Sequence, residues 1–326
     1  MSTKRLGLGA LAALAGGGAV AAAVSSGTVL SLLTQAIIYA VFAIGVGVLL
    51  RQNGMVSFGH ALFFGSSGYA VGLILQLKLM PAEAALPLVL LGVLLAAFLM
   101  GLVIVRVPGV AFGMLTLAIG QMFYLTASRS RGLTGGADGM NIEWPSTLYG
   151  LSMSTLLKPA NFFMVSWATL VLVMLLLALL LRSRFGAITE AVRDNEERAR
   201  FIGIKTLLPR ATVYALSATV TGLAGLLSAL NTGFVSPENL HWSLSGVALM
   251  MVVVGGYKAL WGPALGAVVY FLAKDILGDF ANHWMAIFGV ALITVIVFSP
   301  TGIAGALERL VKGKKPSPAG AKPGGH

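Results

Sequence analysis

Two polar side chains stand out in an apolar stretch near the start of the chain. Gly54–Tyr69 reads GMVSFGHALFFGSSGY, which places Ser57 and His60 three positions apart. A serine and a histidine can act as a nucleophile and its base, but that pair also needs a group to orient the histidine, and no carboxylate accompanies them. Polar groups inside an apolar segment must face protein or water. The expected chemistry is therefore hydrogen bonding and not catalysis.

The glycines of this stretch bear on how its backbone runs. Gly54 and Gly59 weaken a helix, so one interpretation is a broken or re-entrant element, and such breaks line transport pathways. In the alternative, an ordinary helix begins at the membrane interface and Ser57 is its N-cap. Under the first interpretation the candidate pathway residues are Ser57, Phe58, Gly59, His60 and Ser66.

A second polar motif is Leu133–Gly139, LTGGADG. Paired glycines can cradle a phosphate, but a P-loop also needs a lysine and a following helix, and neither is present. We expect a turn that forms a docking or gating surface; a purely structural turn is the alternative. Asp138 could also bind a cation or a substrate ammonium group. The candidate residues are Thr134, Gly135, Gly136 and Asp138.

The densest charge in the chain lies at 183–209. From Ala187 to Gly203 the pattern predicts one helix with small residues at every fourth position, and a helix with a small, smooth face can press into a groove on a partner protein. A solvated connector on the membrane surface is the alternative. The stripe consists of Ala187, Ala191, Asn195, Ala199 and Gly203. The candidate contact residues are Glu190, Ala191, Arg193, Asp194, Asn195, Glu196, Ala199 and Gly203.

The composition shows which elements must position these candidates. Apolar residues make up 57% of the chain and charged residues 10%, against about 25% charged in soluble domains. Continuous apolar runs exclude a β-barrel, and several are about 20 residues long, enough to cross a bilayer. We predict an all-α, polytopic transmembrane helical bundle of about ten spans, with a range of eight to ten. The predicted spans are 7–24, 29–50, 57–77, 85–105, 109–127, 160–181, 211–230, 243–257, 260–277 and 284–300.

The distribution of basic residues predicts the orientation. With a cytoplasmic N-terminus, seventeen of the 22 lysines and arginines fall on the inside of this map, as the positive-inside rule requires. Both termini and the segment 183–209 are then cytoplasmic, and 128–159 is outside. This asymmetry accounts for the net charge of +11, so we expect the lipid bilayer, and no nucleic acid, as a partner.

The two ends of the chain differ in composition from the predicted spans between them. Residues 1–26 resemble a signal peptide, yet we expect a retained first helix because many spans follow. Residues 1–310 then form one transmembrane domain that includes the loop 183–209, and residues 311–326 form a disordered basic tail. The chain has no cysteine and no Walker A motif, and we expect no metal or cofactor.

Several motifs together resemble the permeases of branched-chain amino acid ABC transporters, the LivH/LivM type. SRFGAITEAVRDNEERARFIGI resembles the cytoplasmic loop of that family, and GMVSFGHALFFGSSGY, LTGGADG, GFVSP, GGYKALWGPALGA and the segment 299–305 resemble further family strings in the same order. The resemblance covers about residues 28–310 and is closer to the LivM-like subunit. One departure is Gly255-Gly256-Tyr257-Lys258, which lacks the third glycine of the family pattern.

This resemblance implies a permease subunit of an ATP-driven importer in the bacterial inner membrane. It implies a second permease subunit forming a heterodimer, two ATP-binding subunits and a periplasmic substrate-binding protein, and it makes residues 183–209 the loop that couples to the ATPases. Branched-chain amino acids are the implied substrate, with urea, amides or aromatic acids as alternatives. A different class, an ion-coupled secondary transporter, would need intramembrane carboxylates; Asp275 and Asp279 are the candidates.

A weak internal similarity links Phe58–Leu62, FGHAL, with Trp261–Leu265, WGPAL. Both segments would enter the membrane from the cytoplasmic side. An inverted repeat requires opposite directions of entry, so we treat this similarity as coincidental.

Overall fold

The computed structural model describes residues 3–280, 289–290 and 301–312. Nearly all of the predicted tenth span, 284–300, and of the predicted tail lies outside these residues. Long helices dominate the rest, as predicted. They are α1 Thr3–Ala23, α2 Gly27–Asn53, α3 Ala61–Gln76, α4 Ala82–Ile104, α5 Gly109–Arg129, α8 Pro159–Leu181, α11 Leu207–Thr232, α12 Trp242–Gly255 and α13 Gly262–Phe280.

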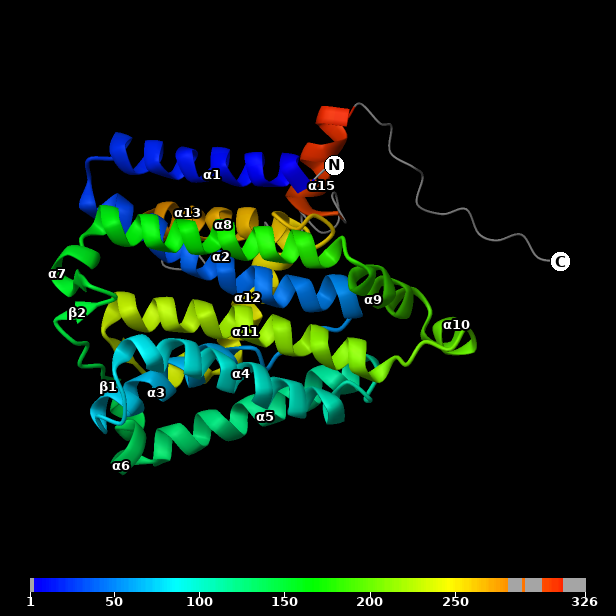
Figure 1. The fold of residues 1–326 in the computed structure, drawn as a ribbon, viewed down its shortest axis with the longest axis horizontal. Coiled ribbons are helices and arrows are strands. Elements are labelled where there is room, and N and C mark those ends of the chain that lie inside the picture. Colours follow the sequence, from blue (N-terminus) through cyan, green and yellow to red (C-terminus); the bar gives the residue numbers. More distant parts are fainter. Residues whose placement is uncertain (1–2, 281–288, 291–300, 313–326) are drawn as a thin grey trace.

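Five of these helices are long and apolar enough to cross a membrane: α2, α4, α5, α8 and α11. They run side by side along the long axis of the molecule (Figure 1). Helices α3 and α12, of 16 and 14 residues, are shorter than the roughly 20 residues that a span needs. Helix α12 nearly coincides with the predicted eighth span, 243–257, whereas α3 begins four residues after the start of the predicted third span, 57–77. Both are partial helices that begin inside the bundle.

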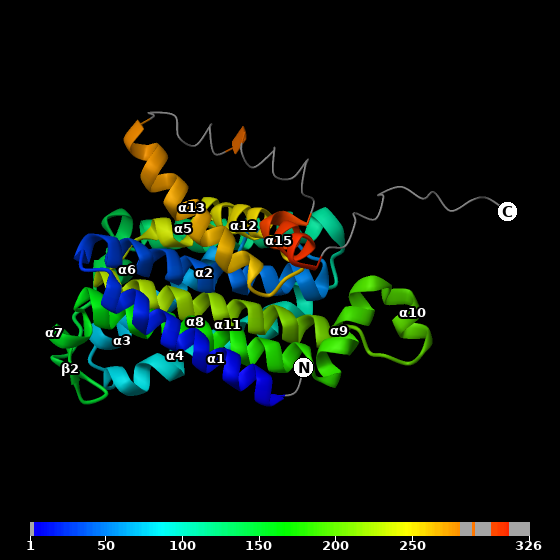
Figure 2. The ribbon, with the colours of Figure 1, turned by 90° about the horizontal axis from the view of Figure 1, so that it is seen from above.

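Short elements gather at the two ends of the bundle. We call the end that carries α9 and α10 the charged end; the start of α1 and helix α15 lie toward it too (Figures 1 and 2). The hairpins and short helices that follow α5 lie at the opposite end. These short elements are α6 Arg131–Thr134, η1 Gly136–Asp138, β1 Met140–Asn141, β2 Thr147–Leu148, β3 Leu151–Ser152, α7 Met153–Leu156, α9 Arg184–Asp194, α10 Glu196–Phe201, β4 Phe234–Val235, η2 Pro237–Leu240 and α15 Gly302–Lys312.

The central helices α2 and α11 are antiparallel and closely packed. At the charged end, the Asn53 side-chain amide at the end of α2 donates to the Arg210 carbonyl near the start of α11, at 2.9 Å. Farther in, Gly45 lies against Ser217 and Thr221. Small residues let two helix backbones approach in this way, which is how membrane helices associate.

The α2–α3 and α11–α12 units share one design in opposite directions. Both long helices end at a left-handed glycine, Gly54 with φ 66° and Gly233 with φ 63°, and both glycines begin a G-x-V-S sequence that leaves the helix. A partial helix follows each non-helical segment. Ala61 at the start of α3 donates its N–H to the Ser245 hydroxyl in the first turn of α12, at 2.8 Å.

This arrangement is an inverted repeat that exchanges packing partners. Helix α3 packs on α11, where Gly222 and Gly225 face its backbone, and α12 packs on α2, where Gly47 faces Val252. Each partial helix is thus held by the long helix of the other unit. Helix α1 lies outside this centre and packs on α8, where the Trp167 indole N–H donates to the Ala13 carbonyl at 2.9 Å.

Candidate functional site

The segment between α2 and α3 is the broken element that the glycines indicated. Ser57 is completely buried, and its hydroxyl accepts from the Gly59 N–H at 3.3 Å. The Phe58 N–H donates to the Thr116 hydroxyl of α5, also at 3.3 Å. The alternative in which Ser57 caps a helix is wrong, because α3 begins four residues later, at Ala61, with His60 at the N-cap position. Non-helical backbone at this depth requires such protein partners.

His60 joins the broken segment to both long helices. Its Nε2 lies 2.7 Å from the Ser217 hydroxyl, which lies 2.6 Å from the Gly45 carbonyl. Because a carbonyl only accepts, the serine proton points to Gly45, so Nε2 of His60 must be the donor to Ser217. Ser217 is ten residues into α11, about 15 Å from its start at 1.5 Å per residue. His60 therefore holds a buried junction inside the bundle, and it is 0% exposed.

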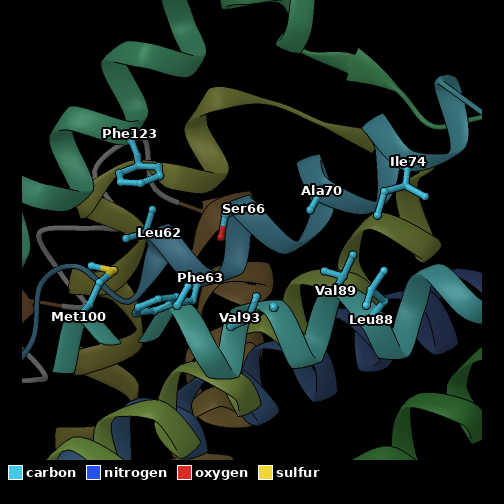
Figure 3. Close-up of a pocket in the computed structure, with 12 residues that line it drawn as sticks. Leu62, Phe63, Ser66, Ala70, Ile74, Leu88, Val89, Val93, Met100 and Phe123 are labelled. Carbon is cyan, nitrogen blue, oxygen red and sulfur yellow. The ribbon is translucent and has the colours of Figure 1, made fainter. Parts of the chain in front are cut away.

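Ser66 has a different environment from the other four pathway candidates. It lies on the face of α3 that borders an apolar cavity of about 330 Å³, and its hydroxyl points into that space (Figure 3). Helix α4 forms the facing wall with Val89 and Val93, and Phe123 of α5 closes one side. The structure thus separates Ser66, which lines a cavity, from Ser57, which bonds within its own segment, and from His60, which bonds to α11.

The LTGGADG turn lies at the opposite end of the bundle. The Thr134 hydroxyl is 2.6 Å from the Ala127 carbonyl and 2.8 Å from that of Ser130, so it ties the turn to the end of α5. A side chain on Gly135 would overlap the Gly139 carbonyl, which explains the glycine. Asp138 is exposed. Just beyond the turn, β1 pairs with β4, so this loop covers the second non-helical segment.

The charged segment is not one helix. Helix α9 ends at Asp194, and α10 begins at Glu196. Asn195 lies between them in an extended conformation, and its side-chain oxygen accepts from the Arg198 N–H at 2.8 Å. Asparagine is a strong N-cap, so it starts a new helix in a new direction. The prediction of one continuous helix from 187 to 203 is therefore wrong.

The break also divides the stripe of small residues. Ala187, Ala191 and Asn195 are exposed, and so is Gly203, which has a φ of 86°. Ala199 is only 3% exposed, so it packs inside the segment and does not present a surface. The most exposed apolar side chains here are Phe201 and Ile202, at 90% and 72%; the sequence analysis did not single out Phe201.

Helix α9 is anchored to the end of α2. The Thr189 hydroxyl donates to the Gln52 side-chain oxygen at 2.7 Å, and the Arg193 guanidinium donates to the Arg51 carbonyl at 2.6 Å. That carbonyl belongs to the last turn of α2, where a cation stabilises the unpaired helix end. Arg193 also forms ion pairs with Asp194 at 2.7 Å and Glu190 at 3.5 Å.

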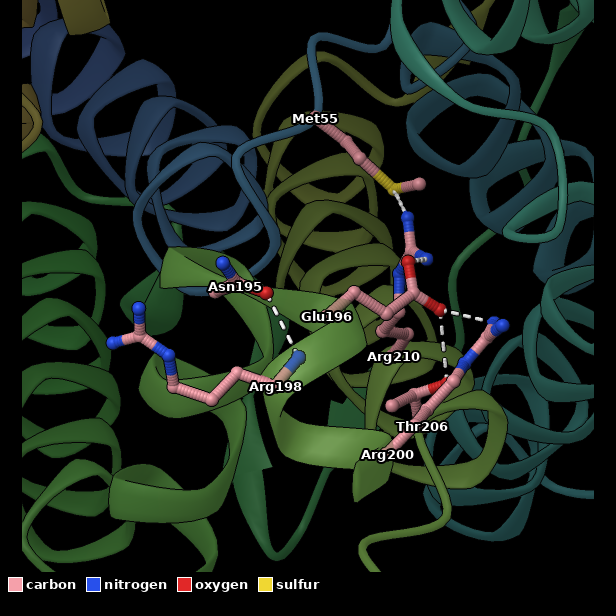
Figure 4. Close-up of polar contacts among 7 residues, drawn as sticks. All are labelled: Met55, Asn195, Glu196, Arg198, Arg200, Thr206 and Arg210. Carbon is pink, nitrogen blue, oxygen red and sulfur yellow. Dashed lines mark hydrogen bonds and ion pairs between the residues drawn. The ribbon is translucent and has the colours of Figure 1, made fainter. Parts of the chain in front are cut away.

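Helix α10 is anchored to the start of α11 through Glu196 (Figure 4). Its carboxylate accepts from Arg200 and Arg210 at 2.6 Å each and from the Thr206 hydroxyl at 2.9 Å. Partial burial alone would raise the pKa of Glu196, but the Thr206 hydrogen bond and the charges of Arg210 and Arg200 outweigh it and hold that pKa below its ordinary value. Arg210 also contacts the Met55 sulfur at 3.7 Å, which connects α10 to the segment that leads to His60.

The roles of Gln52, Arg210 and Ser217 were not foreseen. Gln52 is 137 positions from Thr189, and Ser217 is 157 positions from His60. Arg210 is 14 positions from Glu196 and lies in a different helix. No local pattern pairs residues across such separations. Among the residues that the structure describes, no three histidine, aspartate or glutamate side chains lie together as a metal site would require.

Comparison with known proteins identifies the family of this chain. The family described as "Branched-chain amino acid transport system / permease component" matches residues 28–297. The chain belongs to this family. It is a permease component of an ABC-type transport system, an integral membrane protein and not an enzyme, and its class implies ATP-binding and substrate-binding partners.

Named relatives in the family differ in their substrates. The high-affinity branched-chain amino acid transport system permease protein LivM of Escherichia coli is 27% identical over an alignment of 300 residues that covers 86% of this chain and 70% of that protein. LivM of Salmonella typhimurium is 28% identical over the same shares. The autoinducer 2 import permease LsrC of Salmonella typhimurium is 27% identical, over 88% of this chain and 82% of that protein. No solved structure matches the chain.

Proposed function

We propose that this permease carries branched-chain or closely related amino acids across the bacterial inner membrane. A periplasmic binding protein delivers the substrate, a second permease subunit completes the membrane unit, and two ATP-binding subunits supply the energy. The match to the family and to LivM over most of the chain supports this assignment. Membership in an ABC-type family also favours it over an ion-coupled secondary transporter.

The attachment of α9 and α10 to the central helices provides a route for coupling ATP hydrolysis to transport. These helices project beyond the bundle (Figure 2), yet Arg193 holds α9 to the end of α2 and Glu196 holds α10 to the start of α11. A push on the pair when the ATP-binding subunits close therefore reaches the two central helices. Those helices meet at the junction of His60, Ser217 and Gly45, so their relative shift would move the start of α3.

The surface offered to the ATP-binding subunits is the exposed part of this segment. Ala187, Ala191 and Asn195 form a small-residue face, flanked by the acids Glu190 and Asp194. Phe201, exposed by 90%, provides an apolar anchor of the kind that dominates protein interfaces. Small residues admit a close partner, while the aromatic ring supplies buried area on contact.

The translocation pathway borders α3 in this proposal. Ser66 provides a hydroxyl to the cavity between α3 and α4, while Ser57, Phe58, Gly59 and His60 fix where α3 begins. An amino acid zwitterion needs hydrogen-bonding groups and no strong fixed charge along its path. Asp138, exposed at the opposite end, and the turn at 134–136 would form the surface that receives the binding protein.

Uptake in vesicles tests the substrate and the energy source together. The permease pair is reconstituted with its ATP-binding subunits and loaded binding protein, and leucine, autoinducer 2, urea, amides and aromatic acids are compared. We expect ATP-dependent, vanadate-sensitive uptake of leucine. Uptake of another of these solutes, with none of leucine, would contradict the substrate; uptake without ATP would contradict the mechanism.

A bulky substitution tests the docking face. We expect Ala191→Trp to prevent co-purification of the ATP-binding subunits while the permease remains inserted, because overpacking costs about 1–3 kcal/mol or more. Ala199→Trp is not a clean test, since that residue is buried within the segment. Ala84→Trp, also exposed but at the opposite end, is the matched control and should leave co-purification intact.

A further inference from the structure

A basic cavity lies at the charged end, between parts of the chain that are far apart in sequence. It has a volume of about 510 Å³. Arg51 comes from the last turn of α2, Arg193 and Glu190 from α9, and Tyr257 and Lys258 from the turn between α12 and α13. A ligand bound here would contact both units of the inverted repeat and α9 at once.

The charges in this cavity are unbalanced. Three cations and one acid line it, and Arg193 is already engaged by Glu190, Asp194 and the Arg51 carbonyl. Within the described residues, neither the Arg51 guanidinium nor the Lys258 ammonium group forms an ion pair. Arg51 is partly buried, and the one acid of the cavity, Glu190, is paired with Arg193, so a cation partly removed from water shares its counter-charge with a second cation. The cavity is therefore suited to an anion.

The position of the cavity indicates where the anion comes from. Arg51 lies in the last turn of α2, which is long and apolar enough to span the membrane, so the cavity lies at the level of lipid headgroups. Leu50 and Tyr257 add an apolar wall, and tyrosine is typical of the membrane interface. Basic pockets between membrane helices on the cytoplasmic side bind anionic headgroups.

We infer that this cavity holds the phosphate headgroup of an anionic phospholipid, with Arg51 and Lys258 as its main cationic partners. The bound headgroup stabilises α9 against the end of α2 and the α12–α13 turn. The transport complex then depends on anionic lipid for the coupling of ATP hydrolysis to uptake, beyond the proposed transport activity itself. A free phosphate ion and an acidic side chain of an ATP-binding subunit share part of this chemistry, so the test must separate them.

The binding test uses the full-length permease in vesicles of phosphatidylcholine with and without phosphatidylglycerol, followed by native mass spectrometry. We expect retained phosphatidylglycerol in the wild type. Arg51→Gln and Lys258→Gln should each weaken retention about fivefold, the equivalent of about 1 kcal/mol per basic residue near an anionic surface. Arg182→Gln removes an exposed arginine that does not line the cavity and should change nothing. Lys258 is exposed, so its variant should fold normally.

Two further arms separate the other sources of the anion. Inorganic phosphate added to the detergent-solubilised permease should not raise its melting temperature, whereas phosphatidylglycerol should; equal shifts would mean a free anion and overturn the lipid assignment. Adding the ATP-binding subunits should leave the retained lipid in place, and its displacement would assign the cavity to a partner carboxylate instead. Equal retention in all variants would also overturn the inference. Lipid retention is measured without transport, so failure here leaves the proposed function standing.

Discussion

Gly225 sets how closely α3 can approach α11. A Cβ atom at this position would lie 2.0 Å from the Phe64 carbonyl oxygen and 2.4 Å from the Ser67 hydroxyl. An ordinary contact begins near 3.4 Å, so Gly225→Ala requires α3 to move away by about 1.4 Å. The atom in the way is backbone and cannot rotate aside. We therefore expect the whole partial helix to shift.

The cost of that shift can be estimated from the contacts it disturbs. Overpacking a close contact costs about 1–3 kcal/mol, occasionally more. The Ser67 hydroxyl lies 2.8 Å from the Gly222 carbonyl and 2.9 Å from that of Phe64, and losing such a hydrogen bond costs about 0.5–1.5 kcal/mol. Gly225→Ala should thus destabilise the permease by roughly 3 kcal/mol, despite the better helix propensity of alanine.

Thermal unfolding of the purified permease in detergent measures this effect, with Gly92→Ala as the matched control. Gly92 is also helical, but nothing lies within 4 Å of a Cβ placed there, so its alanine should be neutral or stabilising by up to about 1 kcal/mol. We expect a clearly lower melting temperature for Gly225→Ala alone. If the two variants melt together, the packing of α3 on α11 is not as described and the argument fails.

Three further predictions concern the charged end and the junction. The melting temperature of the wild type should fall as the pH drops below about 4.5, because the partners of Glu196 lower its pKa and their stabilisation is lost when the carboxylate is protonated. Glu196→Gln should show no such step in melting temperature against pH. An identical step in this variant would contradict the role of the pair with Arg210. His60→Ala should reduce uptake by up to about tenfold, the equivalent of about 0.5–1.5 kcal/mol for one hydrogen bond, without preventing assembly of the complex. Ser217→Ala should have the same effect. Wild-type uptake, or failure of the complex to assemble, would count against the pathway assignment. A cysteine replacing Asp194 should resist impermeant thiol reagents in intact cells, and labelling there would reverse the predicted orientation.

The sequence predicts the parts of this fold that depend on local patterns. The helical class and the positions of the long helices follow from runs of apolar residues, and five of the ten predicted spans are long and apolar enough to cross a membrane. The glycines at 54 and 59 indicate the break before α3. The sequence analysis did not predict the break between α11 and α12. The only sequence signal for it is the match of Gly233-Phe234-Val235-Ser236 to Gly54-Met55-Val56-Ser57 at the first break.

The sequence predicted the location of the candidate site residues but not the course of the chain or the side-chain partners there. A stripe of small residues at every fourth position fits one helix, but the capping preference of Asn195 outweighs that periodicity and redirects the chain. The buried state of Ala199 follows from this turn. The pairing of His60 with Ser217 and that of Glu196 with Arg210 depend on how the helices pack, and no local spacing encodes them. The pairing of Glu196 with Arg200, by contrast, has the i, i+4 spacing of a single helix.

The exchange of packing partners between the two units has a consequence for how the chain is made. His60 and Ser217 are 157 residues apart, and ribosomes add about 5–20 residues per second. His60 is therefore synthesised roughly 8–30 s before Ser217. During that interval α3 has neither α11 to pack on nor Ser245 to accept its first N–H. Helix α3 can therefore reach its final packing only after α11 and α12 have been synthesised. Until then we expect the membrane-insertion machinery to hold the nascent α3 and keep it from entering the lipid.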